Sequence, residues 1–193
     1  VFNIALDGNF DDCQKFVKAM FVDKNFSQAI NMSGVNSINW ARIIIQVVYY
    51  FFAYFNVAKN EEKINFSVPT GNFGDIYAGY IAKKMGLPIN KLIIATNSND
   101  ILNRVLKTGV YKPSKVKHTV SPSMDIQVAS NFERLIFDVC SSNSYKTFKL
   151  MENLKKLGEF KLEKKELKKI KENFYSESLS NAETRLIIRK TYK

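Results

Sequence analysis

Hydrophobic positions along the chain fall into two patterns, short continuous runs and longer stretches with helical spacing. The short runs have the length of buried strands and occupy residues 1–6, 64–68 and 91–96. The stretches with helical spacing occupy residues 11–21, 36–55, 73–84, 100–107, 126–140, 145–157, 163–174 and 181–192. Residues 25–34 and 111–123 are interpreted as loops. Two strands joined by one helix form a β-α-β unit, so the pattern predicts an α/β fold with a parallel sheet and a helical C-terminal part.

The stretch 36–55 is the most apolar helix of the pattern, and Asn36 or Ser37 is its expected N-cap. Polar residues at Asn39, Arg42 and Gln46 leave only 47–55 as an uninterrupted apolar run. That run is short of the roughly 20 residues that span a bilayer. We therefore expect a core helix that packs on all sides, and no membrane partner.

Residues 69–75 join a predicted strand to a predicted helix through Gly71 and Gly74. Free amides in the first helical turn and the helix dipole favour an anion at such a junction, and glycines let the backbone approach it closely. The sequence therefore predicts a phosphate site here. Because the spacing matches neither common nucleotide-binding glycine motif, an ordinary tight turn stays open as the alternative.

The chain has a formal net charge of +11, which raises the possibility of a nucleic-acid partner. Glutamates interleave with the lysines over 146–171, as expected for a solvated helix face, and no RNA-binding aromatic signature accompanies them. We therefore expect no nucleic-acid partner, although a non-catalytic basic binding module remains an alternative.

Two cysteines, Cys13 and Cys140, are far apart in the sequence and fit reduced thiols in a cytoplasmic protein. With these and the single His118, which we expect to be exposed, no metal site is expected.

The sequence resembles the threonine synthase family, pyridoxal-phosphate enzymes, and most closely its longer bacterial and fungal type. Six short motifs carry the resemblance in the family's order, and it extends over residues 1 to about 138. The motifs are 7–13 (DGNFDDC), 36–42 (NSINWAR), 69–75 (PTGNFGD), 95–97 with 99–102 (ATN and NDIL), 121–126 (SPSMDI) and 130–134 (SNFER).

The resemblance implies an incomplete α/β fold type II pyridoxal-phosphate enzyme, similar to the β subunit of tryptophan synthase. Residues 1–35 would end one α/β subdomain, 36–140 would form the domain that binds the cofactor phosphate, and 141–193 would be a lysine-rich helical segment. The loop implied to hold the phosphate of pyridoxal 5′-phosphate consists of Gly71, Asn72, Phe73, Gly74 and Asp75. We expect Asp75 to cap the following helix or to order the loop.

The implied reaction converts O-phospho-L-homoserine and water into L-threonine and phosphate. Candidate substrate ligands cluster at the start of the apolar helix and are Asn36, Ser37, Asn39 and Arg42. Arg42 suits a phosphate or carboxylate or, alternatively, a structural ion pair. Structural roles are expected for a second block, in which Ser123 or Asp125 would cap a helix; it comprises Ser121, Ser123, Asp125, Asn131 and Arg134.

None of the lysines present matches the family's Schiff-base lysine, which we expect in a segment that precedes Val1. No catalytic residue is therefore assigned, and we expect this piece to be inactive alone. A related phospholyase that eliminates phosphate without the same addition of water remains an alternative.

Overall fold

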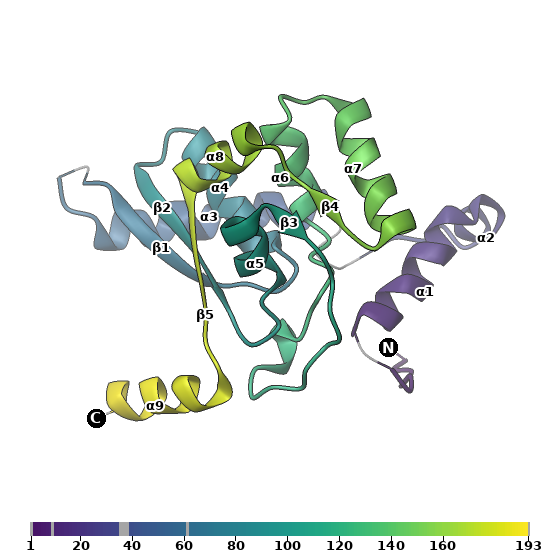
Figure 1. Ribbon diagram of the computed structural model, residues 1–193, viewed down its shortest axis with the longest axis horizontal. Helices are drawn as coiled ribbons and strands as arrows, with labels where there is room; N and C mark the ends of the chain where they lie inside the picture. Colours follow the sequence, from purple (N-terminus) through teal and green to yellow (C-terminus); the bar gives the residue numbers. More distant parts are fainter. Residues whose placement is uncertain (1, 9, 35–38, 61, 193) are drawn as a thin grey trace.

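The computed structural model describes residues 2–8, 10–34, 39–60 and 62–192 (Figure 1). The helices are α1 (Phe10–Val22), α2 (Lys24–Ala29), α3 (Trp40–Val57), α4 (Gly74–Lys84), α5 (Ile101–Thr108), α6 (Phe132–Val139), α7 (Ser144–Leu157), α8 (Lys164–Asn173) and α9 (Asn181–Thr191), with a 3₁₀ turn η1 (Pro122–Met124). The strands are β1 (Ile64–Pro69), β2 (Ile89–Thr96), β3 (Val110–Tyr111), β4 (Phe160–Lys161) and β5 (Phe174–Ser178).

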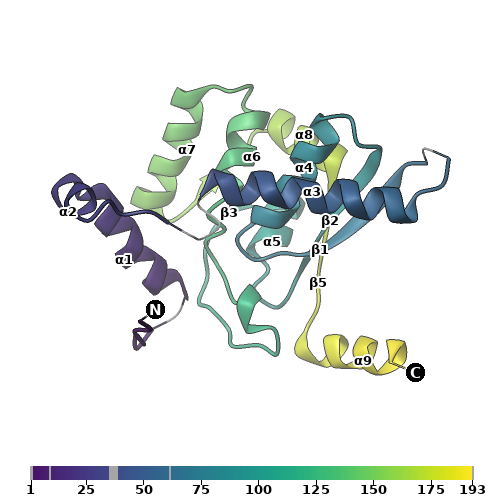
Figure 2. The same ribbon diagram turned by 180° about the vertical axis from the view of Figure 1, so that it is seen from behind.

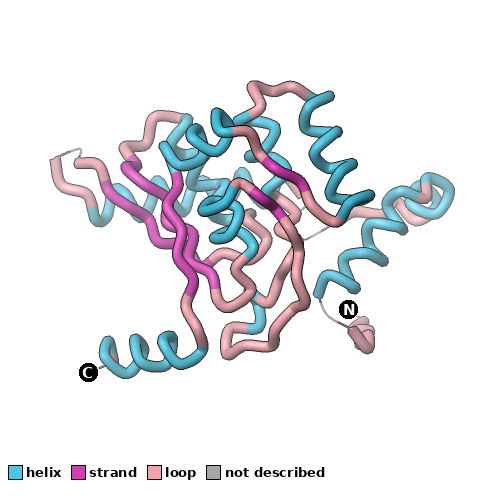
Figure 3. The backbone as a smooth tube through the Cα atoms, in the orientation of Figure 1, coloured by secondary structure: helices cyan, strands magenta, loops and turns pink. Residues whose placement is uncertain are grey.

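The larger sheet is parallel and has the order β1-β2-β5; its strands are the three long magenta ones on the left of Figure 3. The β1–α4–β2 crossover confirms the β-α-β unit that the hydrophobic pattern predicts. The third strand, β5, was not predicted, because it is short and directly follows α8 without an intervening turn. It comes from the segment 141–193, so this segment contributes a strand to the sheet as well as helices.

Helix α4 packs closely against α3, and a glycine sets the distance between them. A Cβ atom on Gly79 would lie 2.5 Å from Cε1 of Tyr50. From α3, the Tyr50 hydroxyl donates a hydrogen bond of 3.0 Å to the carbonyl oxygen of Asp75 at the start of α4. This contact ties α3 to the junction that precedes α4.

Only one stripe of α3 is buried, so the expectation that this helix packs on all sides is wrong. Figure 2 shows α3 at the front of the molecule, with no other described helix or strand drawn over its outer side. The buried residues recur at helical spacing and are Ile43, Val47, Tyr50 and Tyr54. On the opposite face Phe52 and Phe55 are 71% and 74% exposed. Among the described helices, α3 alone has the length and apolarity of a membrane span, which is weak evidence because core helices share both properties.

The start of α3 also differs from the prediction. Its N-cap is Asn39, whose side-chain oxygen accepts a hydrogen bond of 3.0 Å from the amide of Ala41. The predicted caps Asn36 and Ser37 lie outside the described residues.

The strand predicted at the N-terminus is wrong for the residues that the structure describes. Residues 2–6 are exposed, and none of the described strands pairs with their backbone.

Two further boundaries differ from the prediction. The predicted loop after α1 contains helix α2, which Asp23 caps by accepting a hydrogen bond from the amide of Phe26. Further along, α6 begins at Phe132 rather than near residue 126.

The lysine-rich tail is mostly solvated, as predicted, with Glu152 paired to Lys149 and Lys156. Glu166 is the exception, since its side chain is 1% exposed and its Oε1 pairs with Lys146 at 2.9 Å. Both cysteines are free thiols, and His118 is exposed as predicted.

Candidate functional site

A cavity of about 420 Å³ lies beyond the carboxyl end of β1, where open α/β sheets bind their ligands. Segments from α3, from the β1–α4 junction and from η1 enclose it. The lining residues are Arg42, Gln46, Pro69, Thr70, Gly71, Asn72, Phe73, Gly74, Asp75, Ile76, Ser123 and Met124. The structure therefore brings all five predicted loop residues into one cavity, which we call the junction pocket.

The amides of the junction are available to a ligand. Thr70 donates to the carbonyl of Ala95 as part of the sheet, and Tyr77 makes the first helical bond, to the carbonyl of Phe73. Between these two, the amide groups of residues 71–76 donate to no acceptor among the described residues. Six successive donors at a helix N-terminus make this wall of the pocket an anion site in chemical terms.

Gly71 allows the junction to lie against the segment that carries η1. A Cβ atom at this position would approach the carbonyl oxygen of Ser123 to 3.2 Å and Cδ1 of Ile126 to 2.9 Å. Any side chain at Gly71 would therefore push the two walls of the pocket apart.

Phe73 has a left-handed backbone conformation, with a φ of 66°, which is strained for a residue with a bulky side chain. Its ring is 1% exposed and packs against Phe132 and Phe174 at centroid distances of 5.2 and 5.6 Å. This aromatic packing holds the junction in its strained shape.

Asn131 fixes the orientation of one peptide group of the junction. Its backbone amide and its side-chain Nδ2 both donate to the carbonyl oxygen of Asn72, at 3.1 and 3.2 Å. The C=O and N–H of a trans peptide point in opposite directions, so the amide of Phe73 is directed away from Asn131. Arg134 in turn donates from Nε to Oδ1 of Asn131 at 2.9 Å, which supports the structural role expected for both residues.

Asp75 does not cap α4, contrary to one expectation, because the N-cap is Phe73 and no described side chain makes a cap hydrogen bond there. The Asp75 carboxyl lies in the first turn of the helix, and partial desolvation raises its pKa above the ordinary value.

Of the four candidate substrate ligands, Arg42 lines the junction pocket. The side chain of Asn39 is engaged in capping α3 and in a 2.8 Å hydrogen bond to the carbonyl of Gly34. Asn36 and Ser37 lie outside the described residues. Sequence reasoning missed Gln46, which lines the pocket four residues after Arg42, on the same side of α3.

A buried polar network anchors the η1 wall. The Asp125 carboxylate accepts hydrogen bonds from Asn97, Asn99 and Thr119, at distances from 2.7 to 3.0 Å. Neither Ser123 nor Asp125 caps a helix as expected, because α6 begins later and has Asn131 at its N-cap. The polar turn after β2 therefore serves to position the pocket wall.

Similarity to known proteins shows to which family this chain belongs. No protein-family model matches the sequence. Two curated relatives align over nearly the whole chain, the threonine synthases of Saccharomyces cerevisiae (48% identity over 98% of this chain) and Pseudomonas aeruginosa (45% over 100%). This chain belongs to the threonine synthase family.

Solved structures of threonine synthases agree with the fold. A pyridoxal-phosphate-bound threonine synthase from Brucella melitensis superposes with a TM-score of 0.86 and 50% identity over 96% of this chain, and the yeast enzyme with 0.82 and 46% over 96%. The fold is therefore type II, as the resemblance implies. The chain spans 39% and 41% of the two curated relatives, and 41% and 38% of the two solved chains.

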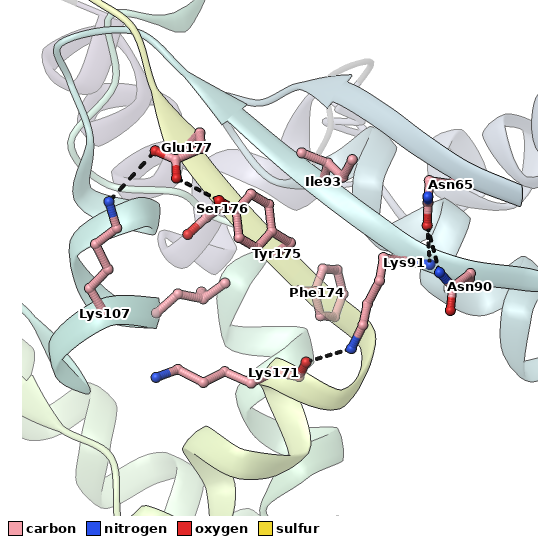
Figure 4. A pocket seen from close by; sticks show the side chains of 11 residues that line it. Asn65, Asn90, Lys91, Ile93, Lys107, Lys171, Phe174, Tyr175, Ser176 and Glu177 are labelled. Carbon is pink, nitrogen blue, oxygen red and sulfur yellow. Dashed lines mark hydrogen bonds and ion pairs between the residues drawn. The ribbon is translucent and has the colours of Figure 1, made fainter.

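A second cavity of about 570 Å³ lies between β2, β5 and α5 in this member of the threonine synthase family (Figure 4). Its polar groups already bind one another: Lys91 donates to the carbonyls of Lys171 and Glu172, and Lys107 pairs with Glu177. The junction pocket, with its unused amides, is therefore the better candidate site.

Proposed function

We propose that this chain forms the cofactor-phosphate site of a threonine synthase, in which the junction amides hold the phosphate of pyridoxal 5′-phosphate. The observation that carries the proposal is the run of six amides without an acceptor among the described residues. The Brucella melitensis threonine synthase, whose structure was solved with pyridoxal phosphate bound, supports the same assignment.

The chemistry of the pocket fits a phosphate dianion. Backbone amides at the start of α4 supply donors without a counter-charge, and the helix dipole adds favourable potential. Gly71 lets the junction lie against the segment that carries η1, and the strained backbone of Phe73 is part of the conformation that presents the amides. The lining residues include no lysine among the part of the chain that the structure describes, so these residues grip the phosphate and supply no amine for covalent attachment.

We infer that the substrate is O-phospho-L-homoserine and that the products are L-threonine and phosphate, formed in the cytoplasm. When bound, pyridoxal phosphate supplies an electron-withdrawing ring that eases the removal of protons from the substrate carbons. Arg42 on the α3 wall would bind an acidic group of the substrate through its guanidinium.

The experiment that tests the site compares pyridoxal phosphate with pyridoxal, which lacks the phosphate. In the full-length protein, Gly71→Val is expected to weaken pyridoxal-phosphate binding by at least about tenfold, because the side chain separates the walls and misaligns donors to a charged group. Absorbance titration measures the affinity, and Gly8→Ala, at a site distant in sequence, is the control. Unchanged affinity in Gly71→Val would contradict the proposal.

Product analysis tests the reaction. Release of L-threonine and phosphate from phosphohomoserine supports the synthase, whereas phosphate with an unsaturated or keto product indicates the phospholyase. Binding of DNA at physiological salt, falling steeply as salt rises, would instead favour the basic binding module.

A further inference from the structure

Gln46 on α3 has a buried side-chain oxygen without a hydrogen-bond donor. Its Oε1 is shielded from solvent, and no described residue donates to it. The side chain lines the junction pocket together with Arg42, one helical turn earlier. A buried polar atom that lacks a partner is costly, so such atoms mark places where a ligand or water completes the site.

The carboxamide of Gln46 is free to reorient. No described residue accepts a hydrogen bond from its Nε2 either, so no hydrogen bond within the described part of the chain holds the group in one orientation. Oxygen and nitrogen of an amide exchange places by a half-turn about the last side-chain bond. Either a donor or an acceptor can therefore be presented to the pocket at the same position.

The opposite wall decides which orientation a ligand would select. Across the pocket, the amides of residues 71–76 attract an anion, and Arg42 adds positive charge on the α3 side. An anion between these walls repels Oε1 and attracts Nε2, because hydrogen bonds to a charged acceptor are stronger than neutral ones.

We propose that Gln46 is a further ligand of the phosphate group held by the junction amides, with its Nε2 donating to a phosphate oxygen. This inference rests on the proposed function. Gln46 would add a side-chain donor from α3 to the backbone donors of the β1–α4 junction, so that two elements of the fold bind the phosphate.

The test uses Gln46→Met in the full-length protein, which keeps the length of the side chain and removes the amide. Affinity for pyridoxal phosphate is expected to fall about tenfold to a hundredfold, the range for a lost hydrogen bond to a charged group. Affinity for pyridoxal is expected to stay unchanged, because pyridoxal lacks the phosphate. The melting temperature without cofactor is expected to stay the same or rise, since an unsatisfied buried oxygen is removed.

A second variant, Gln46→Glu, tests the sign of the interaction. A carboxylate at this place repels the phosphate, so affinity is expected to fall below that of Gln46→Met at neutral pH. The deficit relative to wild type should shrink as the pH is lowered and the carboxyl group becomes protonated. Gln28→Met, on the exposed surface of α2, is the matched control and should bind like wild type.

The outcomes separate this inference from the proposed function. A wild-type protein that does not bind pyridoxal phosphate overturns the proposed function itself. Normal cofactor binding in wild type, with equal affinity in Gln46→Met, overturns only the role of Gln46. Equal losses for pyridoxal phosphate and pyridoxal also overturn it, because the contact would then be to the ring.

Discussion

Contacts from other segments fix the orientation of the peptide group between Asn72 and Phe73 in the junction pocket. Asn131 holds its carbonyl oxygen with two hydrogen bonds, and aromatic packing fixes the strained backbone of Phe73. The conformation is thus imposed from outside the junction, by residues about 60 positions later in the sequence. A ligand then meets donors that are already in place and does not have to order them.

Asn131→Asp tests this control with almost no change in shape. The variant keeps an oxygen for Arg134 but replaces the Nδ2 donor by a carboxylate oxygen facing the Asn72 carbonyl. We expect a loss of about 1–3 kcal/mol in unfolding free energy and weaker binding of pyridoxal phosphate. Chemical denaturation and cofactor titration measure the two effects.

Asn173→Asp is the matched control for that variant. Its Nδ2 also donates to a backbone carbonyl, that of Lys169, but on the exposed surface of α8. It should leave cofactor affinity unchanged. Equal cofactor affinity in Asn131→Asp and wild type would show that the orientation of the Asn72–Phe73 peptide does not matter.

The distance between α3 and α4 determines the width of the junction pocket, because α3 carries Gln46 and the junction leads into α4. Gly79 lets the Tyr50 ring approach α4, and the Tyr50 hydroxyl then binds the Asp75 carbonyl. Helix packing therefore shapes the junction pocket, although neither Gly79 nor Tyr50 lines it.

Gly79→Ala is expected to force the helices apart, since its Cβ would lie 2.5 Å from the Tyr50 ring and 2.9 Å from Cδ2 of Leu92. Overpacking of this kind costs about 1–3 kcal/mol, more than the helix propensity gained by alanine. Thermal unfolding measures the loss. Adding Tyr50→Leu should recover part of it, and strictly additive effects would argue against the contact.

The whole molecule leaves a large apolar surface on the outer face of α3. The residues that are at least 46% exposed there are Ile44, Ile45, Val48, Tyr49, Phe52, Phe55 and Val57. Exposed apolar patches on this scale promote association. Figure 2 shows α3 lying across the front of the molecule, where no other described element covers this face.

The isolated 193-residue chain is therefore expected to self-associate despite its net charge of +11. Ile45→Lys combined with Phe52→Lys should lower the average mass in sedimentation, because both side chains are more than 60% exposed. The unfolding free energy should change by less than about 0.5 kcal/mol, as for surface substitutions. Equal association of both forms would point to a different surface.

The sequence was informative where local rules decide the structure. Apolar spacing predicted the β1–α4–β2 unit and the helices α7, α8 and α9 to within a few residues, since turns and caps mark their ends. The same spacing wrongly predicted a strand at residues 2–6, because this apolar run has no neighbouring strand among the described residues. It also wrongly predicted that α3 packs on all sides, because apolarity alone does not show which face of a helix is covered.

For the site, the sequence alone determined the glycine-containing junction between β1 and α4 and its suitability for an anion, because strand, turn and helix follow one another locally. Only the tertiary structure decided that the amides of residues 71–76 lack acceptors among the described residues, that Asn131 orients the Asn72 carbonyl and that Gln46 faces the same pocket. Those facts depend on contacts between segments distant in the chain, and no local pattern of hydrophobic and polar residues encodes such contacts.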